Sequence, residues 1–254
     1  MSYNPLSGKF SWTLAPVSAL LFYGILFTLW LSLPPAVAQR LFDCDGASPV
    51  ELMTLPLFAA IIPLVWLCPP VSGPVKRKCL WSAVFSVLAA IAIVRETDLH
   101  KILFAQIWPE VASSFKGTVF KMKFLSSPGM PVCAKIFVAG FFALFFAFTV
   151  IPLARWIWPI LKGIPRLQPV AWTMAGFGAV GVTVQFFDRF PSIYRKGSMF
   201  GKAPGTPLND SASALFTIFE EGGEMLMALL ALLAILQAYA IFSKDNSAAA
   251  APEI

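Results

Sequence analysis

Six long apolar runs divide this chain and leave few folds open to it. Each run is close to the roughly 20 residues that an α-helix needs to cross the hydrocarbon core of a bilayer. Residues within a run are apolar throughout, whereas the strands of a membrane barrel alternate apolar and polar side chains. The sequence therefore predicts an all-α transmembrane bundle. Its six spans occupy residues 12–33, 51–67, 80–94, 135–154, 170–187 and 214–242.

The rest of the chain is too short and too apolar for a soluble domain. Of the 254 residues, 58% are hydrophobic and 13% are charged. No polar segment is long enough to build a core of its own, so we expect one integral membrane domain over residues 1–254. The basic excess, 19 Lys and Arg against 13 Asp and Glu, lies in loops between the apolar runs. That pattern is typical of topology signals rather than of nucleic-acid binding, which we exclude.

The basic residues also predict an orientation. Short loops rich in Lys and Arg stay on the cytoplasmic side, and Lys76-Arg77-Lys78 forms such a cluster between the second and third runs. The same face would hold both termini and the 155–168 loop. We predict a plasma membrane protein, most simply of a bacterial inner membrane, with both termini in the cytoplasm. Six basic residues in the 95–135 region weigh against this orientation, but long loops follow the rule poorly.

A possible cleavage site follows the first run. Ala36 and Ala38 give the segment 34–39 the small residues of a signal-peptidase site. The apolar stretch before it has about 20 residues, and a signal core usually has 7–15. We therefore expect a retained first helix. Cleavage of residues 1–38 is the alternative and would leave five spans.

The outer loops contain two further features. Cys44 and Cys133 both fall on the predicted outer side, where an oxidising compartment would allow a disulfide between them; unpaired core cysteines are the alternative. The 96–134 loop is too long to lack structure. Apolar residues recur in it at helical spacing and predict an amphipathic helix at the membrane interface. They are Leu99, Ile102, Leu103, Ile107 and Val111.

The most informative motif is Phe219-Glu220-Glu221-Gly222-Gly223-Glu224, directly before the apolar run that ends at Phe242. Carboxylates at the edge of a span are costly and indicate a partner or a function. Glu220 and Glu224 are four residues apart and share a helix face, and Glu221 is three from Glu224. We expect all three to point into one cavity. The two glycines would let a neighbouring backbone approach or let the helix open locally.

Acids from three distant segments are predicted at one depth. A helix rises 1.5 Å per residue, so about 20 residues from Lys78 reach Asp98 at the outer boundary. The fifth run ends next to Asp188, and about 20 residues back from Phe242 lie Gly223 and its acidic neighbours. The sequence therefore predicts a carboxylate pocket that opens to the outer side. It would be built from the ends of the third, fifth and sixth spans.

Several chemistries fit such a pocket. The predicted cation- or proton-binding residues are Glu96, Asp98, Asp188, Glu220, Glu221 and Glu224. An all-oxygen site suits Mg²⁺, Ca²⁺ or Mn²⁺, with Glu220, Glu221 and Glu224 as the predicted metal ligands. Beyond such a divalent cation, the sequence indicates no cofactor. Arg95 and Arg189 lie at the same depth, so a structural ion-pair network is the alternative to a binding site.

His100 is the only histidine, so the chain cannot ligate a haem with two histidines or build a histidine-rich zinc centre. With Glu96 and Asp98 it forms a candidate catalytic acid–base set. No P-loop, dinucleotide-binding or Gly-x-Ser-x-Gly motif is present in the sequence.

Three functional classes therefore remain. The first is a small transporter coupled to a cation or to protons. The second is a membrane enzyme acting on a lipid or lipid-linked substrate at the outer leaflet. The third is a non-catalytic subunit that has a partner in a membrane complex and a structural ion-pair network.

Overall fold

The computed structural model describes residues 11–43, 48–97, 99–107, 109, 125, 131–197, 205 and 208–249, with 100, 101, 104 and 244–249 described by their backbone alone. These residues form helices and no strand. In chain order the elements are α1 (Leu14–Ser32), α2 (Pro35–Phe42), α3 (Pro49–Leu67), α4 (Val75–Glu96), α5 (Leu99–Ile107), α8 (Val132–Phe145), the π-helical turn η1 (Phe146–Val150), α9 (Ile151–Gly163), α10 (Pro169–Arg195) and α11 (Asp210–Ala249).

Six of the described helical segments are long and apolar enough to cross a membrane. They are α1, α3, α4, the continuous segment Val132–Gly163 made of α8, η1 and α9, α10, and α11 as far as Ser243. The predicted all-α bundle of six spans is therefore confirmed, and the chain is a multi-pass membrane protein. All of these helices except α1 extend beyond the predicted apolar runs, most of all in the fourth, fifth and sixth spans.

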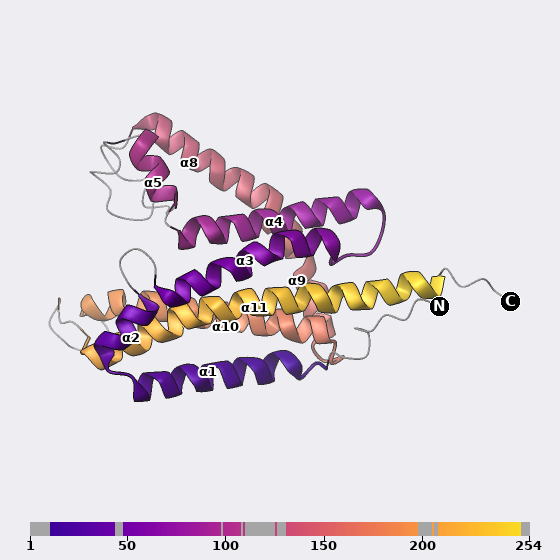
Figure 1. The fold of residues 1–254 in the computed structure, drawn as a ribbon. Coiled ribbons are helices and arrows are strands. Elements are labelled where there is room, and N and C mark those ends of the chain that lie inside the picture. The colour runs from indigo at the N-terminus through magenta and orange to yellow at the C-terminus, as the bar shows by residue number, and fades with distance from the viewer. Residues whose placement is uncertain are drawn as a thin grey trace.

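Helix α11 is the centre of the bundle. It packs against α10, α3, α2 and α1, and Figure 1 shows it between α3 on one side and α10 and α1 on the other. In its apolar window 44% of residues are buried, against 22% at most in any other span. Apolar character alone does not give α11 this place, since the segment Val132–Gly163 is at least as hydrophobic and only 11% of its apolar window is buried.

Helix α4 stands apart from the α10–α11 pair. It packs against α3, α5 and η1, and in the described part of the chain its backbone does not closely approach α10 or α11. Helix α8 lies farther out on the same side (Figure 1). The space between α4 and the α10–α11 pair is where the candidate site lies.

Local sequence explains where α3 begins. Ser48 and Glu51 form a reciprocal capping box, in which Ser48 Oγ accepts a hydrogen bond from the Glu51 N–H at 3.1 Å. The Glu51 carboxylate in turn accepts from the Ser48 N–H at 2.6 Å. Pro49 at the first helical position needs no donor there. The cap therefore fixes the Glu51 side chain at the end of the bundle where α2 and α5 lie.

The fourth span continues past two prolines. Pro152 lacks an N–H and its ring crowds the preceding turn, and the π-helical turn η1 ends two residues before it, at Val150. Pro159 also lies within the helix, which ends at Gly163, two residues before Pro165. The helix therefore extends beyond the predicted run 135–154 at both ends.

Gly222 and Gly223 do not open α11, which is continuous from Asp210 to Ala249. The expectation of local unwinding was wrong. A Cβ on Gly222 would lie 2.6 Å from Leu26 of α1, and one on Gly223 would collide with Val184 of α10. Side chains of two neighbouring helices thus fill the places that the glycines leave, which supports the close-approach expectation.

Helix α2 was not predicted. The segment read as a possible cleavage site is helical, and its residues Ala38 and Phe42 are buried in a cluster that includes Leu26 and Ile218. Retention of the first span stays a prediction. The predicted interfacial helix is present as α5, with Leu99, Ile102, Leu103 and Ile107 exposed, and its place at the membrane surface stays a prediction. Val111 lies outside the described residues.

The ends of the helices agree with six crossings. The start of α1, the connection from α3 to α4 and the C-terminal end of α11 lie at one end of the bundle, and α2 and α5 lie at the other (Figure 1). Which end faces the cytoplasm stays a prediction. Cys133 is exposed at the start of α8, and Cys44 lies outside the described residues, so their disulfide also stays a prediction.

Candidate functional site

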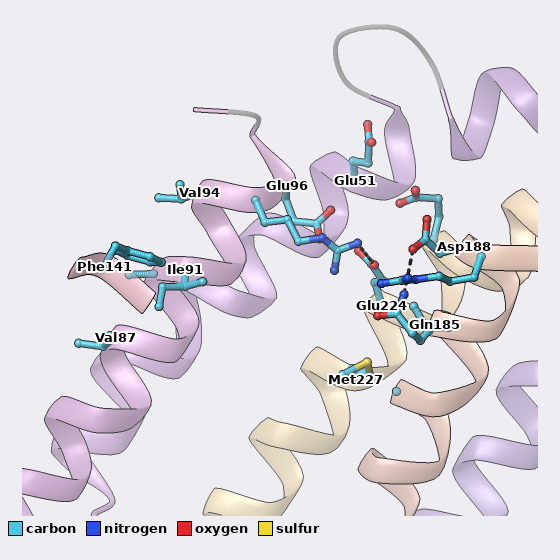
Figure 2. A pocket seen from close by; sticks show the side chains of 16 residues that line it. Glu51, Val87, Ile91, Val94, Glu96, Phe141, Gln185, Asp188, Glu224 and Met227 are labelled. Atoms are coloured by element: carbon cyan, nitrogen blue, oxygen red, sulfur yellow. Dashed lines mark hydrogen bonds and ion pairs between the residues drawn. The ribbon is translucent and has the colours of Figure 1, made fainter. Parts of the chain in front are cut away.

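A cavity of about 880 Å³ lies between α4 and the α10–α11 pair. Five elements contribute to its wall, and Figure 2 shows its side chains. The lining residues are Glu51 of α3; Val87, Ala90, Ile91, Val94, Arg95 and Glu96 of α4; Phe141 of α8; Gly181, Val184, Gln185, Asp188 and Arg189 of α10; and Glu221, Glu224 and Met227 of α11.

Three carboxylates meet in this cavity. Glu96 comes from the last turn of α4, and Glu221 and Glu224 come from one face of α11. One oxygen of each lies within 4.8 Å of an oxygen of the other two. Glu224 is 4% exposed, and the other two are half-buried. These are distances at which three oxygens can ligate one cation.

Arg95 links α4 to α11. Its Nη2 donates to Glu224 Oε1 in the one ion pair found among the described residues (Figure 2). The two side chains differ in environment, since that of Arg95 is 61% exposed and that of Glu224 is 5% exposed. A buried carboxylate needs such a partner, and the structure places the Arg95 guanidinium beside Glu224.

The cavity as a whole is acidic. Five carboxylates and two guanidinium groups line it, so acids are in excess by three. Arg95 neutralises the equivalent of one carboxylate. In a site walled by apolar helices, charges interact more strongly than in water, so the remaining negative charge needs protons or a further cation.

Asp188 and Arg189 lie on the α10 side of the cavity, and both are exposed. Gln185 Nε2 donates to Asp188 Oδ2 at 2.9 Å (Figure 2). Asp188 therefore lines the predicted cavity but does not belong to the three-carboxylate cluster. The described ion pair of the site involves Arg95 and not Arg189.

Glu220 differs from the expectation for the acidic motif. It is half-buried but is not among the cavity-lining residues, so the shared cavity holds for Glu221 and Glu224 only. The group geometrically suited to a metal is Glu96, Glu221 and Glu224, rather than the predicted set of three from α11. The reason is that Glu96 arrives from another helix, which helical phase within α11 could not reveal. Metal binding itself stays a prediction.

The predicted acid–base set falls largely outside the described side chains. Asp98 is not among the described residues, and His100 is described only as part of the α5 backbone. Of that set, Glu96 alone is placed in the cavity. A catalytic role for these residues stays a prediction.

Glu51 is the site residue that the sequence reading missed. It was counted as the first residue of the second span, although the pattern Ser48-Pro49-Val50-Glu51 is a recognisable capping box. That signal places its carboxylate at the helix end, at the depth of the other acids. Phe141 gave no comparable signal, because only the packing of α8 brings it to the cavity.

Comparison with protein-family models, with curated proteins and with solved structures finds no match to this chain. The fold and the site thus define a class by themselves, an α-helical multi-pass membrane protein with an acidic cavity between two of its spans. Any more specific function has to be argued from the geometry of that cavity.

Proposed function

We propose that this protein is a small transporter in which Glu96, Glu221 and Glu224 bind a cation or protons whose movement is coupled to that of a substrate. The observation that carries the proposal is the approach of the three carboxylates. They come from two helices whose backbones lie apart, yet an oxygen of each is within 4.8 Å of the others.

Charge balance gives this cluster its chemistry. One guanidinium group offsets one of the three carboxylates, and the others need protons or a cation in a site walled by apolar helices. Oxygen atoms are the ligands that hard cations prefer. Such a site is stable when it holds protons or when it holds a cation, but not when it is empty. Binding of one therefore releases the other, and this exchange couples the movement of the protons to that of the cation.

In this proposal the Arg95 guanidinium competes with the transported cation for the Glu224 carboxylate. Its side chain is 61% exposed while its partner Glu224 is buried, so the guanidinium can leave without crossing packed protein. A cation that reaches Glu224 takes the place of Arg95, and Arg95 returns when that cation leaves. The pair would then hold the cavity in its resting state.

The proposal includes an orientation. With both termini in the cytoplasm of a bacterial plasma membrane, the cluster faces the outer side, since it lies where α4 ends, away from the start of α1 and the C-terminal end of α11 (Figure 1). The dense Lys76-Arg77-Lys78 cluster at the start of α4 supports this assignment.

The test is proton release on cation binding. Purified protein in weakly buffered detergent solution with a pH indicator is titrated with Na⁺, Mg²⁺, Mn²⁺, tetramethylammonium and tetraphenylphosphonium. We expect at least one cation to release protons from the wild type. Reconstituted vesicles should then show proton movement across the membrane when a gradient of that cation is imposed.

Glu221→Gln is the most informative variant, because the described ion pair does not involve Glu221, so the change leaves the Arg95–Glu224 link intact. Asp210→Asn at the start of α11 is the matched control, since this exposed residue lies outside the cavity. Proton release should be lost in Glu221→Gln and kept in Asp210→Asn. The proposal is overturned if no cation of the panel releases protons from folded wild-type protein, or if Glu221→Gln releases them normally.

A second candidate is a structural subunit of a membrane complex, which the Arg95–Glu224 ion pair favours. It predicts a stable protein without proton exchange, in which the exchanged pair Arg95→Glu with Glu224→Arg restores stability lost in either single variant. The enzyme alternative depends on Asp98 and His100, and it stays a prediction.

A further inference from the structure

The cavity has a charged end and an apolar end. On α4, Arg95 and Glu96 lie in the last turn, and Ile91 and Val87 follow deeper on the same side. Nine residues separate Glu96 from Val87, which is about 13 Å along a helix. In Figure 2 these apolar side chains lie away from the acids, towards the opposite end of the cavity. The carboxylates thus lie at one end of the cavity and the apolar side chains at the other.

The other walls of the deep end are also apolar. Val184 and Gly181 of α10 and Met227 of α11 form one side, and Phe141 of α8 forms another. A Cβ on Gly181 would lie 3.4 Å from Met227 Cε, so the methionine already covers the glycine. None of these groups ligates a hard cation or binds a proton.

The size of the cavity exceeds what an ion requires. Its volume of about 880 Å³ falls in the range of roughly 300–1,000 Å³ that small-molecule pockets occupy. A proton or a metal ion held by three carboxylates fills only the charged end. The apolar part is shaped for an organic group.

The balance of acidic and basic groups in the lining determines which organic molecules the cavity can bind. Acids exceed bases by three among the lining residues, and the most buried of them, Glu224, is 4% exposed. A cationic head group can replace the protons that these acids need, whereas an anionic head group would add further negative charge to the site.

We propose that the cavity binds a lipophilic organic cation. Its ammonium-like head would lie among Glu96, Glu221 and Glu224, in the place that the Arg95 guanidinium occupies beside Glu224. Its apolar body would lie along Val87, Ile91 and Phe141. This inference rests on the proposed function, because it names the substrate class of the same carboxylates.

Two probes of equal shape and opposite charge test the sign. Tetraphenylphosphonium and tetraphenylborate differ in charge and hardly in size, and tetramethylammonium has the charge without the apolar body. Binding to the full-length protein in lipid nanodiscs is measured by calorimetry, with protein-free nanodiscs as the blank. We expect tetraphenylphosphonium to bind at least about tenfold more tightly than either of the others, because only it satisfies both ends of the cavity.

A substitution that fills the apolar part of the cavity tests where the organic cation binds. Ile91→Trp adds bulk to the apolar wall, and Leu144→Trp adds the same bulk to an α8 side chain that is 60% exposed and does not line the cavity. Ile91→Trp should lower the affinity for tetraphenylphosphonium at least about tenfold more than that for Mn²⁺, since the metal needs only the carboxylate end. Leu144→Trp should change neither affinity.

The outcomes separate this inference from the proposed function. Equal binding of the two tetraphenyl ions, or equal effects of Ile91→Trp and Leu144→Trp, overturns the lipophilic cation. In either case Mn²⁺-driven proton release that depends on Glu221 leaves the proposed transporter standing. Loss of proton release with every cation overturns both.

Discussion

At the scale of single residues, Gly222 and Gly223 determine how closely the helices pack, and the acids beside them determine the charge of the cavity. A Cβ on Gly223 would collide with Val184 and would lie 3.1 Å from the Tyr23 hydroxyl. One on Gly222 would meet Leu26. The two glycines let α1 and α10 approach α11 at the level of Glu221 and Glu224, so packing and carboxylate placement depend on the same turn.

Gly223→Ala should therefore destabilise the protein by about 1–3 kcal/mol, the usual cost of forcing a methyl group into a packed interior. Thermal or denaturant unfolding in a mild detergent measures the change. Gly178→Ala on α10 is the control, since no atom lies within 4 Å of the added Cβ. The control should be neutral or more stable by about 0.5–1 kcal/mol, because alanine is the better helix former. Equal stability of the two variants would show that α1 and α10 do not pack at Gly223.

Residue spacing predicted part of the cluster and could not predict the rest. Glu221 and Glu224 share the cavity, as three-residue spacing allows. Glu220 is equally close in phase to Glu224 but does not line the cavity. Helical phase shows which side chains share a face of α11. The neighbouring helices determine which face borders the cavity and which face is packed.

At the scale of elements, α10 and α11 form a pair held at several levels. Toward the C-terminal end of α11, Thr173 Oγ1 donates to Gln237 Oε1 at 2.7 Å, and both residues are buried. Two turns deeper than the acids, Gly176 lies against Leu230. Helix α4 reaches this pair through α3 and through the Arg95–Glu224 link. The cavity thus lies between the tightly packed α10–α11 pair and α4, which is held by fewer contacts.

The apolar runs predicted the existence of every span and underestimated the length of most. Helix α4 begins at Val75 and includes Lys76-Arg77-Lys78, whose charges ended the predicted run at residue 80. Hydropathy reports the part of a helix that matches the hydrocarbon core, whereas hydrogen bonding continues into the interface. Helix α2 escaped prediction for a related reason, since its eight residues are too few to show a clear period.

At the scale of the whole molecule, six crossings and the basic cluster near α4 predict the orientation. Ser72→Cys in the α3–α4 connection and Ser211→Cys at the start of α11 lie at opposite ends of the bundle, and each is tested in a cysteine-free background. A membrane-impermeant maleimide added to intact cells should label Ser211→Cys and leave Ser72→Cys unlabelled until the cells are opened. The reverse pattern would place the carboxylate cluster on the cytoplasmic side. The native Cys68 is a poor reporter, because burial raises the pKa of its thiol and so reduces the reactive thiolate.

The sequence predicts the depth of the site residues in the membrane but not which of these residues are in contact. Counting residues along the helices placed Glu96, Asp188 and Glu224 at one level, and all three line one cavity. Which of them touch depends on the lateral order of the helices, and apolar runs carry no information on that order. The pairing of Arg95 with Glu224 across 129 positions of sequence is therefore a result of the fold alone.

A shared carboxylate cavity requires that α4 and α11 approach each other at Glu96 and Glu221, and short-range cross-linking measures that approach directly. In a cysteine-free background, Glu96→Cys is combined with Glu221→Cys or, as a control, with Asp210→Cys at the start of α11. A short bifunctional thiol reagent applied to native membranes should join the first pair within one chain and leave the second pair open. Absence of the cross-link in the first pair, or equal cross-linking of both, would contradict a shared carboxylate cavity.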